Sequence, residues 1–314
     1  MTKSVIWKRM KIINFIENNV SIVLLMGVPL GLIFPYFGFL KWSLKYILMF
    51  VLFVSFLKID FKEILNYLKN PIIPAYGTLM NMFLAPVIIF LIFSLFMKDY
   101  NFIAAVLLLS AVPSGVASAA MTELTEGDAS LTVIITIFSH FVAPVSIPLL
   151  FFLLLRKIVR LDYVGIFITM LELIIVPLIL AVLFERFFKK QTAFFVRRSK
   201  SITAIPISFI SLIVISINAK FIYTHPVEVL KYLALIYPIY FFFFAFGLLY
   251  VPFLDNRKRI AVSNSKTFMN VSIGIVLAMQ FFNPQTALII TLAQIPWPTM
   301  LGPVNFLMKK LKLK

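Results

Sequence analysis

The sequence predicts an all-α polytopic membrane protein that crosses the bilayer about ten times. Of its 314 residues, 62% are hydrophobic and only 13% are charged, and the mean hydropathy is +1.03. A soluble domain carries about twice this share of charged residues. The apolar residues also form long blocks, which a water-soluble fold of this length could not bury. These observations exclude a compact soluble protein.

Ten apolar blocks are the candidates for membrane-crossing helices. A helix needs about 20 mostly apolar residues to cross the hydrocarbon core. In chain order, the expected cores are residues 20–34, 44–57, 72–97, 102–124, 131–155, 163–183, 202–217, 232–253, 260–281 and 287–308. The second and seventh cores are short, so the number of spans could change by one.

The basic residues orient these spans with both chain ends in the cytoplasm. In that orientation the segments on the cytoplasmic side hold, in chain order, four, three, six, three and four Lys or Arg residues. These are twenty of the 29 in the chain, and an excess of basic residues on the cytoplasmic side is typical of membrane proteins. One cluster disagrees, because Arg156, Lys157 and Arg160 fall in an outer loop. We therefore expect a multi-pass protein of the plasma (inner) membrane. Five spans in each half, residues 1–155 and 156–314, would make the second half enter the membrane in the opposite sense, as an inverted repeat requires.

Composition also narrows the classes of function. The net charge of +17 comes from residues that lie mainly between the apolar blocks and at the chain ends, a pattern typical of membrane orientation rather than of nucleic-acid binding. The chain has no Cys, which excludes disulfides and thiolate metal sites. Only two His are present, and HExxH and GxSxG motifs are absent. We expect no enzymatic activity, no cofactor and no nucleic-acid partner.

The fourth and fifth spans carry the most informative polar residues. Pro113 removes a backbone donor from the fourth span, and Gly115 permits an unwound backbone. A helix broken within the bilayer leaves backbone groups that must pair with protein, water or ligand. A simple Pro kink relieved by a neighbouring helix is the alternative. Polar side chains at every fourth position share one face of the fifth span: Thr132, Thr136 and His140.

This region resembles the bile acid:sodium symporter (BASS) family, as a divergent bacterial or archaeal member. The residues that carry the resemblance are the run PSGVASAAMT at positions 113–122, the pair Gly127-Asp128, and Thr132 and Thr136. The resemblance implies ten helices in two inverted five-helix repeats, residues 1–155 and 156–314. Spans one, two, six and seven would form a panel domain. Spans three to five and eight to ten would form a core domain, in which the broken fourth and ninth helices cross.

The resemblance also implies two sodium sites, which this sequence matches only in part. Ser118, Thr132 and Thr136 match the hydroxyl ligands of one site, whereas Ala119 replaces an expected Asn. The second site would use Asn81 in place of a Gln on the third span. On the ninth span, Ser265 takes the place of the shared Glu, and Met269 takes the place of the Gln that follows it.

The missing carboxylate argues against ordinary sodium coupling. No Asp or Glu follows Asp255, and Lys266 stands beside the position of the expected acid. Lys266 would replace a bound cation or neutralise an anion, or else it would extend to the membrane surface. Glu172 is a candidate for proton binding or for pairing with Lys266, with a structural acid as the alternative. His140 is a weaker candidate for the same roles.

The expected function is secondary active transport of a small organic anion by alternating access, in a lipid bilayer. The substrate would contact Val116, Ser118, Ala119 and Asn270. A proton-linked carrier that uses Glu172, a sodium-coupled symporter with one residual site, and a membrane solute sensor are the alternatives. Sodium is the one ion that the resemblance suggests. The sequence does not distinguish a monomer from a homodimer.

Overall fold

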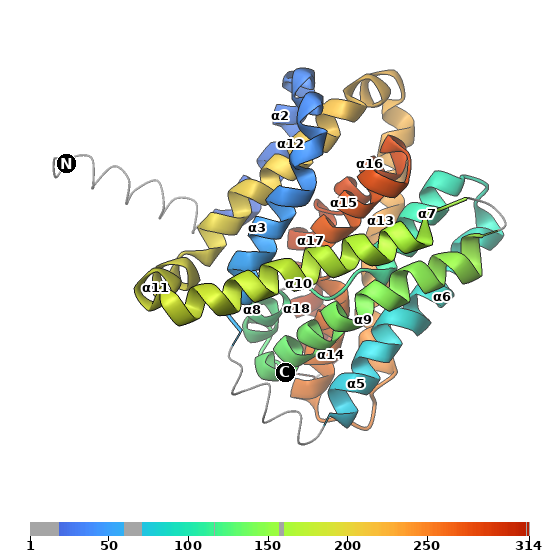
Figure 1. The fold of residues 1–314 in the computed structure, drawn as a ribbon. Coiled ribbons are helices and arrows are strands. Elements are labelled where there is room, and N and C mark those ends of the chain that lie inside the picture. The colour runs from blue at the N-terminus through green and yellow to red at the C-terminus, as the bar shows by residue number, and fades with distance from the viewer. Residues whose placement is uncertain (1–18, 60–70, 116, 157–159, 312, 314) are drawn as a thin grey trace. The chain divides into compact units, whose positions relative to one another are not determined.

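The computed structural model describes residues 19–59, 71–115, 117–156, 160–311 and 313 (Figure 1). Within these ranges the chain forms helices and turns and no strand. The all-helical class expected from the apolar blocks is confirmed. Of the expected site residues, Val116 lies outside the described residues, as do the basic residues that precede the first span.

Six helical segments are long and apolar enough to cross a membrane. They are Pro35–Phe56, Ile72–Phe96, Ala129–Leu155 (α9), Tyr163–Phe187 (α10), Ser199–Thr224 (α12) and Pro226–Leu249 (α13). The segments Pro284–Thr299 and Leu301–Lys310, bent by 50°, become a seventh if they form one span. Three shorter apolar helices are Val20–Ile33 (α2), Tyr100–Ala111 (α7) and Val271–Phe281 (α15). The chain is therefore a multi-pass membrane protein.

The chain divides into two compact units, residues 1–58 with 175–220 and residues 59–174 with 221–314. In the first unit, α2 is followed by η1 (Pro35–Ser43) and α3 (Leu44–Phe56), and the end of α10 by α11 (Lys189–Arg197) and α12. Gly27 and Gly31 let α2 approach α12 closely. A Cβ on Gly27 would lie only 2.0 Å from the carbonyl oxygen of Ser208. Small residues four apart commonly serve this purpose between membrane helices.

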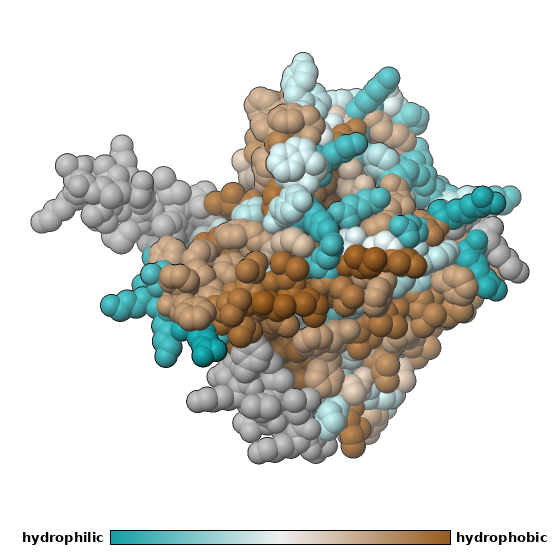
Figure 2. All heavy atoms as spheres, in the orientation of Figure 1, coloured by the Kyte–Doolittle hydropathy of each residue, from teal (hydrophilic) through white to brown (hydrophobic). Residues whose placement is uncertain are grey.

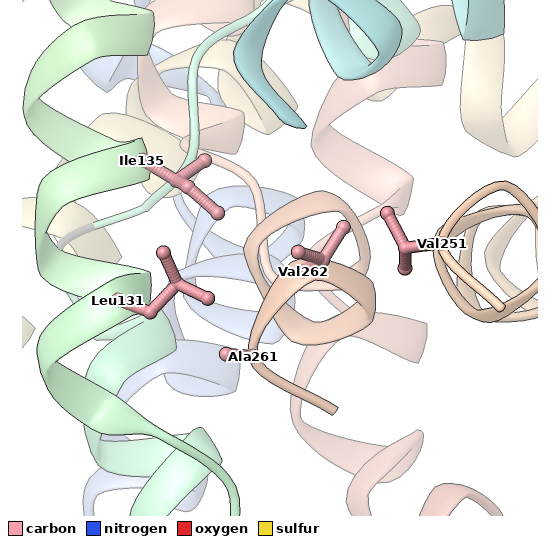
Figure 3. Packing of buried hydrophobic residues seen from close by; sticks show 5 residues of the cluster. All are labelled: Leu131, Ile135, Val251, Ala261 and Val262. Atoms are coloured by element: carbon pink, nitrogen blue, oxygen red, sulfur yellow. The ribbon is translucent and has the colours of Figure 1, made fainter. Parts of the chain in front are cut away.

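The second unit contains the remaining helices. They are α5 (Ile72–Leu79), η2 (Met80–Leu84, a π-helical turn), α6 (Ala85–Phe96), α7, α8 (Ser118–Leu124), α9, the first part of α10, α13, α14 (Asn256–Thr267), α15, α16 (Pro284–Leu292), α17 (Pro296–Thr299) and α18 (Leu301–Lys310). Figure 3 shows one buried apolar cluster of this unit. Leu131 and Ile135 of α9 face Ala261 and Val262 of α14, with Val251 beside them. This contact fixes α14 against α9.

Apolar side chains also cover much of the surface. Figure 2 shows hydrophobic residues over a large part of the visible face. Along α10, for example, Val164, Ile168, Ile179 and Leu180 are all exposed. An exterior of this kind is stable in hydrocarbon and unstable in water, which agrees with the composition.

Candidate functional site

Two helices of the second unit are interrupted at the same place. The first interruption separates α7, which ends at Ala111, from α8, which begins at Ser118. Pro113 lies in it and cannot donate a backbone hydrogen bond. The second interruption, residues 268–270, separates α14 from α15. Pro113 and Gly115 indicated the first break in the sequence, and the family resemblance implied the second, on the ninth span.

The two interruptions cross and pair with each other. The N–H of Gly115 donates to the carbonyl of Phe268 at 2.9 Å, and the N–H of Asn270 donates to the carbonyl of Pro113 at 2.8 Å. Between these bonds, Ser114 and Met269 form an antiparallel bridge. Each break therefore supplies partners for the backbone groups that the other leaves unpaired, as a low-dielectric interior requires.

The crossing is close enough to require glycine at position 115. A Cβ there would lie 2.7 Å from the carbonyl oxygen of Phe268 and 3.1 Å from that of Met269. Met269 also accepts a hydrogen bond from the indole Nε1 of Trp297 at 3.0 Å. Trp297 belongs to the short Pro-rich helix α17.

Three buried hydroxyl groups meet beside the crossing. The Oγ of Ser114 lies 3.0 Å from the Oγ of Ser118 and 3.0 Å from the Oγ1 of Thr136. Ser118 and Thr136 are 3.3 Å apart. The structure thus brings together two residues expected at a sodium site, and it adds Ser114, which sequence reasoning missed.

Thr132, the third hydroxyl expected at that site, lies elsewhere, and the nearby candidates Ala119 and His140 do not join the cluster. The hydroxyl of Thr132 lies 3.0 Å from that of Thr122 and donates to the carbonyl of Ala261 at 3.3 Å. Ala119 is half-buried and has no polar side-chain atom. His140 is buried on α9, and its Nδ1 lies 2.8 Å from the carbonyl of Thr136, one turn earlier. None of these adds an oxygen to the three-hydroxyl cluster.

Lys266 is enclosed by the second unit and is only 2% exposed. Its Nζ donates to the carbonyl of Asn81 at 2.8 Å and, at shorter range, to the carbonyl of Ser110. It also lies 4.7 Å from the centroid of the Phe243 ring, within the range of a cation–π interaction. The ammonium group therefore has polar or aromatic partners from η2, α7 and α13.

Both carbonyls are available because their helices cannot satisfy them. In the π-helical turn η2, the N–H of Ala85 donates to Met80 instead of Asn81, and the next residue, Pro86, has no N–H to donate. The carbonyl of Ser110 would normally pair with the N–H of Ser114, but that group donates to the Oγ of Ser139 at 3.1 Å. Lys266 supplies the two missing donors.

The neighbours of Lys266 are neutral. The side-chain Nδ2 of Asn81 donates to the Oγ of Ser265 at 3.0 Å, and the phenol of Tyr250 donates to Asn81 Oδ1 at 3.1 Å. Among the described residues, no carboxylate forms an ion pair with Lys266. Glu172 is half-buried on α10, and its pairing with Lys266 stays a prediction.

A pair of broken helices that cross inside a bundle of membrane-spanning helices is the construction of a secondary transporter. The profile described as "Sodium Bile acid symporter family" matches residues 45–225, more than half of the chain. The chain belongs to this family of sodium-dependent transporters. It is therefore a membrane transporter and not an enzyme.

Individual relatives agree with this assignment. The sodium-dependent transporter YocS of Bacillus subtilis, itself uncharacterised, is 27% identical over 321 residues that cover 97% of this chain and 95% of YocS. YbaS of the same organism is 23% identical over 299 residues, covering 92% of this chain and 96% of YbaS. The probable sodium/metabolite cotransporter BASS1 of Arabidopsis thaliana chloroplasts is 26% identical over 214 residues, which are 67% of this chain and 53% of the plant protein.

Proposed function

We propose that this protein is a secondary active transporter of a small organic anion, in which the Lys266 ammonium takes the place of a bound sodium ion. The observation that carries the proposal is the enclosure of Lys266. Its ammonium is surrounded by the face of Phe243 and by two carbonyl oxygens that lack a backbone donor. Carbonyl oxygens and aromatic faces both bind monovalent cations. A free sodium ion would meet a fixed positive charge there.

The residues aligned with the sodium site provide no negative charge against that ammonium. Ser265, at the position of the expected Glu, donates its hydroxyl to the carbonyl of Val262 at 2.7 Å and accepts from Asn81. A serine can hold Asn81 in place, but it cannot compensate a cation. Lys266 and a sodium ion in the same space would repel each other strongly, because the surroundings are buried and of low polarity.

The charge balance of the crossing supports an anionic substrate. The N-terminus of α15 begins at the crossing, where its N–H groups carry a partial positive charge. Asn270 caps this terminus and is half-buried, so its side chain is a candidate for contact with the substrate. Together with Lys266, these groups favour a negative ligand. Ser118 and Ala119, at the start of α8, remain candidates on the other broken helix.

The arrangement of helices supports ten spans and alternating access. The six long helices, the bent pair and α2 account for eight spans, and two broken spans, α7 with α8 and α14 with α15, make ten. The first unit, residues 1–58 with 175–220, contains the first, second and seventh of these spans and half of the sixth. The expected panel domain would contain the same spans. Movement of a panel against a core of inverted repeats is the usual basis of alternating access.

The test compares the thermal stability of the purified protein in sodium and in choline. We expect no sodium-specific stabilisation of the wild type, and a lower stability of Lys266→Ala, by roughly 1–3 kcal/mol for each carbonyl left unpaired. Sodium, but not choline, should restore part of this loss in the variant, because the space vacated by the ammonium then accepts an ion. Lys309→Ala, an exposed lysine, is the matched control. Sodium-specific stabilisation of the wild type would contradict the proposal.

A further inference from the structure

The helix α11, Lys189–Arg197, joins two long apolar helices and is too short to be a span itself. Nine residues of helix extend about 14 Å, against a hydrocarbon thickness of about 30 Å. Its neighbours in the chain, α10 and α12, are 25 and 26 residues long and apolar enough to cross the membrane. Helix α10 ends just before α11 begins, and α12 starts just after α11 ends. Helix α11 therefore lies at the membrane surface.

One face of α11 is fixed to the first unit. The ring of Phe195 packs edge-on against Phe53 of α3 and Phe184 of α10, with centroid distances of 6.1 Å and 5.7 Å. Thr192, one turn earlier, is buried, and its hydroxyl donates to the carbonyl of Phe188 at 3.0 Å. This packing fixes which side chains α11 turns outward.

The outward side chains are basic and aromatic at once. Lys189, Lys190 and Arg197 are exposed, and none of them forms an ion pair with a described residue. Phe187, Phe188 and Phe194 are 69%, 48% and 50% exposed. Figure 1 labels α11 at the left of the view. In the same orientation, Figure 2 shows hydrophilic and hydrophobic residues side by side there. The only acid between residues 185 and 200 is Glu185.

This combination fits one environment. In water, three exposed phenylalanines within eight residues would be an unfavourable apolar patch, and in hydrocarbon the ammonium and guanidinium groups would be costly. At the boundary of the headgroups, aromatic rings enter the acyl layer while basic side chains reach the phosphates. Basic side chains close to a membrane surface also bind anionic lipids preferentially.

We propose that α11 is a binding site for anionic phospholipid headgroups. Lys189, Lys190 and Arg197 hold the phosphate and its net negative charge, the Arg through two parallel hydrogen bonds. Phe187, Phe188 and Phe194 lie among the acyl chains beside it. The site is independent of the helix crossing and of the anion that the protein transports.

The experiment counts lipids bound to the purified full-length protein by native mass spectrometry, with phosphatidylglycerol or phosphatidylcholine as the added lipid. The wild type should bind phosphatidylglycerol at least about tenfold more tightly than phosphatidylcholine. Lys189→Gln/Lys190→Gln/Arg197→Gln should lose most of this preference, and Arg197→Gln alone should lose part of it. Inorganic phosphate should not displace the lipid, because it lacks the acyl chains that contact the phenylalanines.

The matched control removes the same charge elsewhere, as Lys98→Gln/Lys231→Gln/Lys309→Gln, and should keep the preference for phosphatidylglycerol. Thermal unfolding of each variant verifies that it is folded. If the α11 variant keeps the lipid preference, or the control loses it to the same extent, the proposal is wrong. Displacement by inorganic phosphate would show that the site recognises the anion alone and would equally contradict it.

Discussion

At the residue scale, the Lys266 ammonium serves as a donor for two backbone carbonyls that belong to different helices. The donors that a regular helix would provide are missing, at Pro86 in one helix and at the helix end near Pro113 in the other. An unpaired carbonyl in such an environment costs about as much as a lost hydrogen bond. The lysine is therefore both a charge and a structural tie between η2, α7 and α14.

Gly115 is the residue at the crossing that tolerates least change. We expect Gly115→Ala to lower the free energy of unfolding by roughly 1–3 kcal/mol, because its Cβ would press on the Phe268 carbonyl at 2.7 Å and separate the two breaks. Thermal unfolding in detergent measures the effect. Gly302→Ala is the control, since a Cβ at Gly302 would meet nothing within 4 Å. Equal stability of the two variants would mean that the crossing is less tight than the structure shows.

The sequence indicated some of the site residues but not their environment. The family resemblance implied Ser118 and Thr136, and Lys266 was indicated by its place in an apolar span. The contacts of Lys266 with Ser110 and Phe243 could not be foreseen, because they depend on how α7, α13 and α14 pack. Ser110 is 156 positions away from Lys266 in the chain. A Pro five residues after Asn81 was the available signal for the free carbonyl there.

At the scale of elements, the breaks and the π-helical turn are the positions where the regular hydrogen-bond pattern fails, and the site is built from them. A second cluster joins the starts of three helices. The phenol oxygen of Tyr232 on α13 lies 2.5 Å from Asp99, at the start of α7, and 2.6 Å from Glu228. It also accepts a hydrogen bond from Gln285 of α16 at 3.0 Å. The Tyr232 hydroxyl thus links α7, α13 and α16 through hydrogen bonds.

We expect Tyr232→Phe to destabilise the protein by roughly 1–3 kcal/mol, because it leaves two carboxyl groups close together without the hydroxyl that bridges them. The measurement is the midpoint of thermal unfolding in detergent. Tyr237→Phe removes a phenol that lies 3.1 Å from the hydroxyl of Thr299, in an exposed contact, and should change the midpoint little. If the two substitutions have the same effect, the Tyr232 cluster does not hold these helices together.

At the scale of the whole molecule, the hydropathy of the sequence was sufficient to predict an all-helical, multi-pass membrane protein. It was less informative about elements that depart from a continuous helix. The predicted block 260–281 is divided by the break at residues 268–270, and its first part, α14, is polar, with Ser263, Asn264 and Lys266 all buried. Hydropathy averages over such a segment, and only the tertiary packing shows why its polar residues are stable there.

The ten-span topology can be tested directly because the chain contains no cysteine. Single cysteines replacing Lys98, Lys190 or Lys309 fall on exposed positions of three separate segments. With ten spans and both ends inside, a membrane-impermeant maleimide added to intact cells should label only Lys98→Cys. Permeabilised cells should give labelling at all three positions. Labelling of Lys190→Cys or Lys309→Cys in intact cells would require a different number or orientation of spans.

The covalent attachment of Lys266 has a consequence for the energetics of transport. A sodium ion enters from one side and leaves on the other, so that its concentration gradient performs work in each cycle. The Lys266 ammonium is bound to α14 and stays with the protein, whichever way the solute moves. In the transporter proposed above, it contributes no stoichiometric ion and no driving force at this position. A carrier built in this way runs in whichever direction its remaining gradients dictate, and it approaches equilibrium unless another ion is coupled elsewhere.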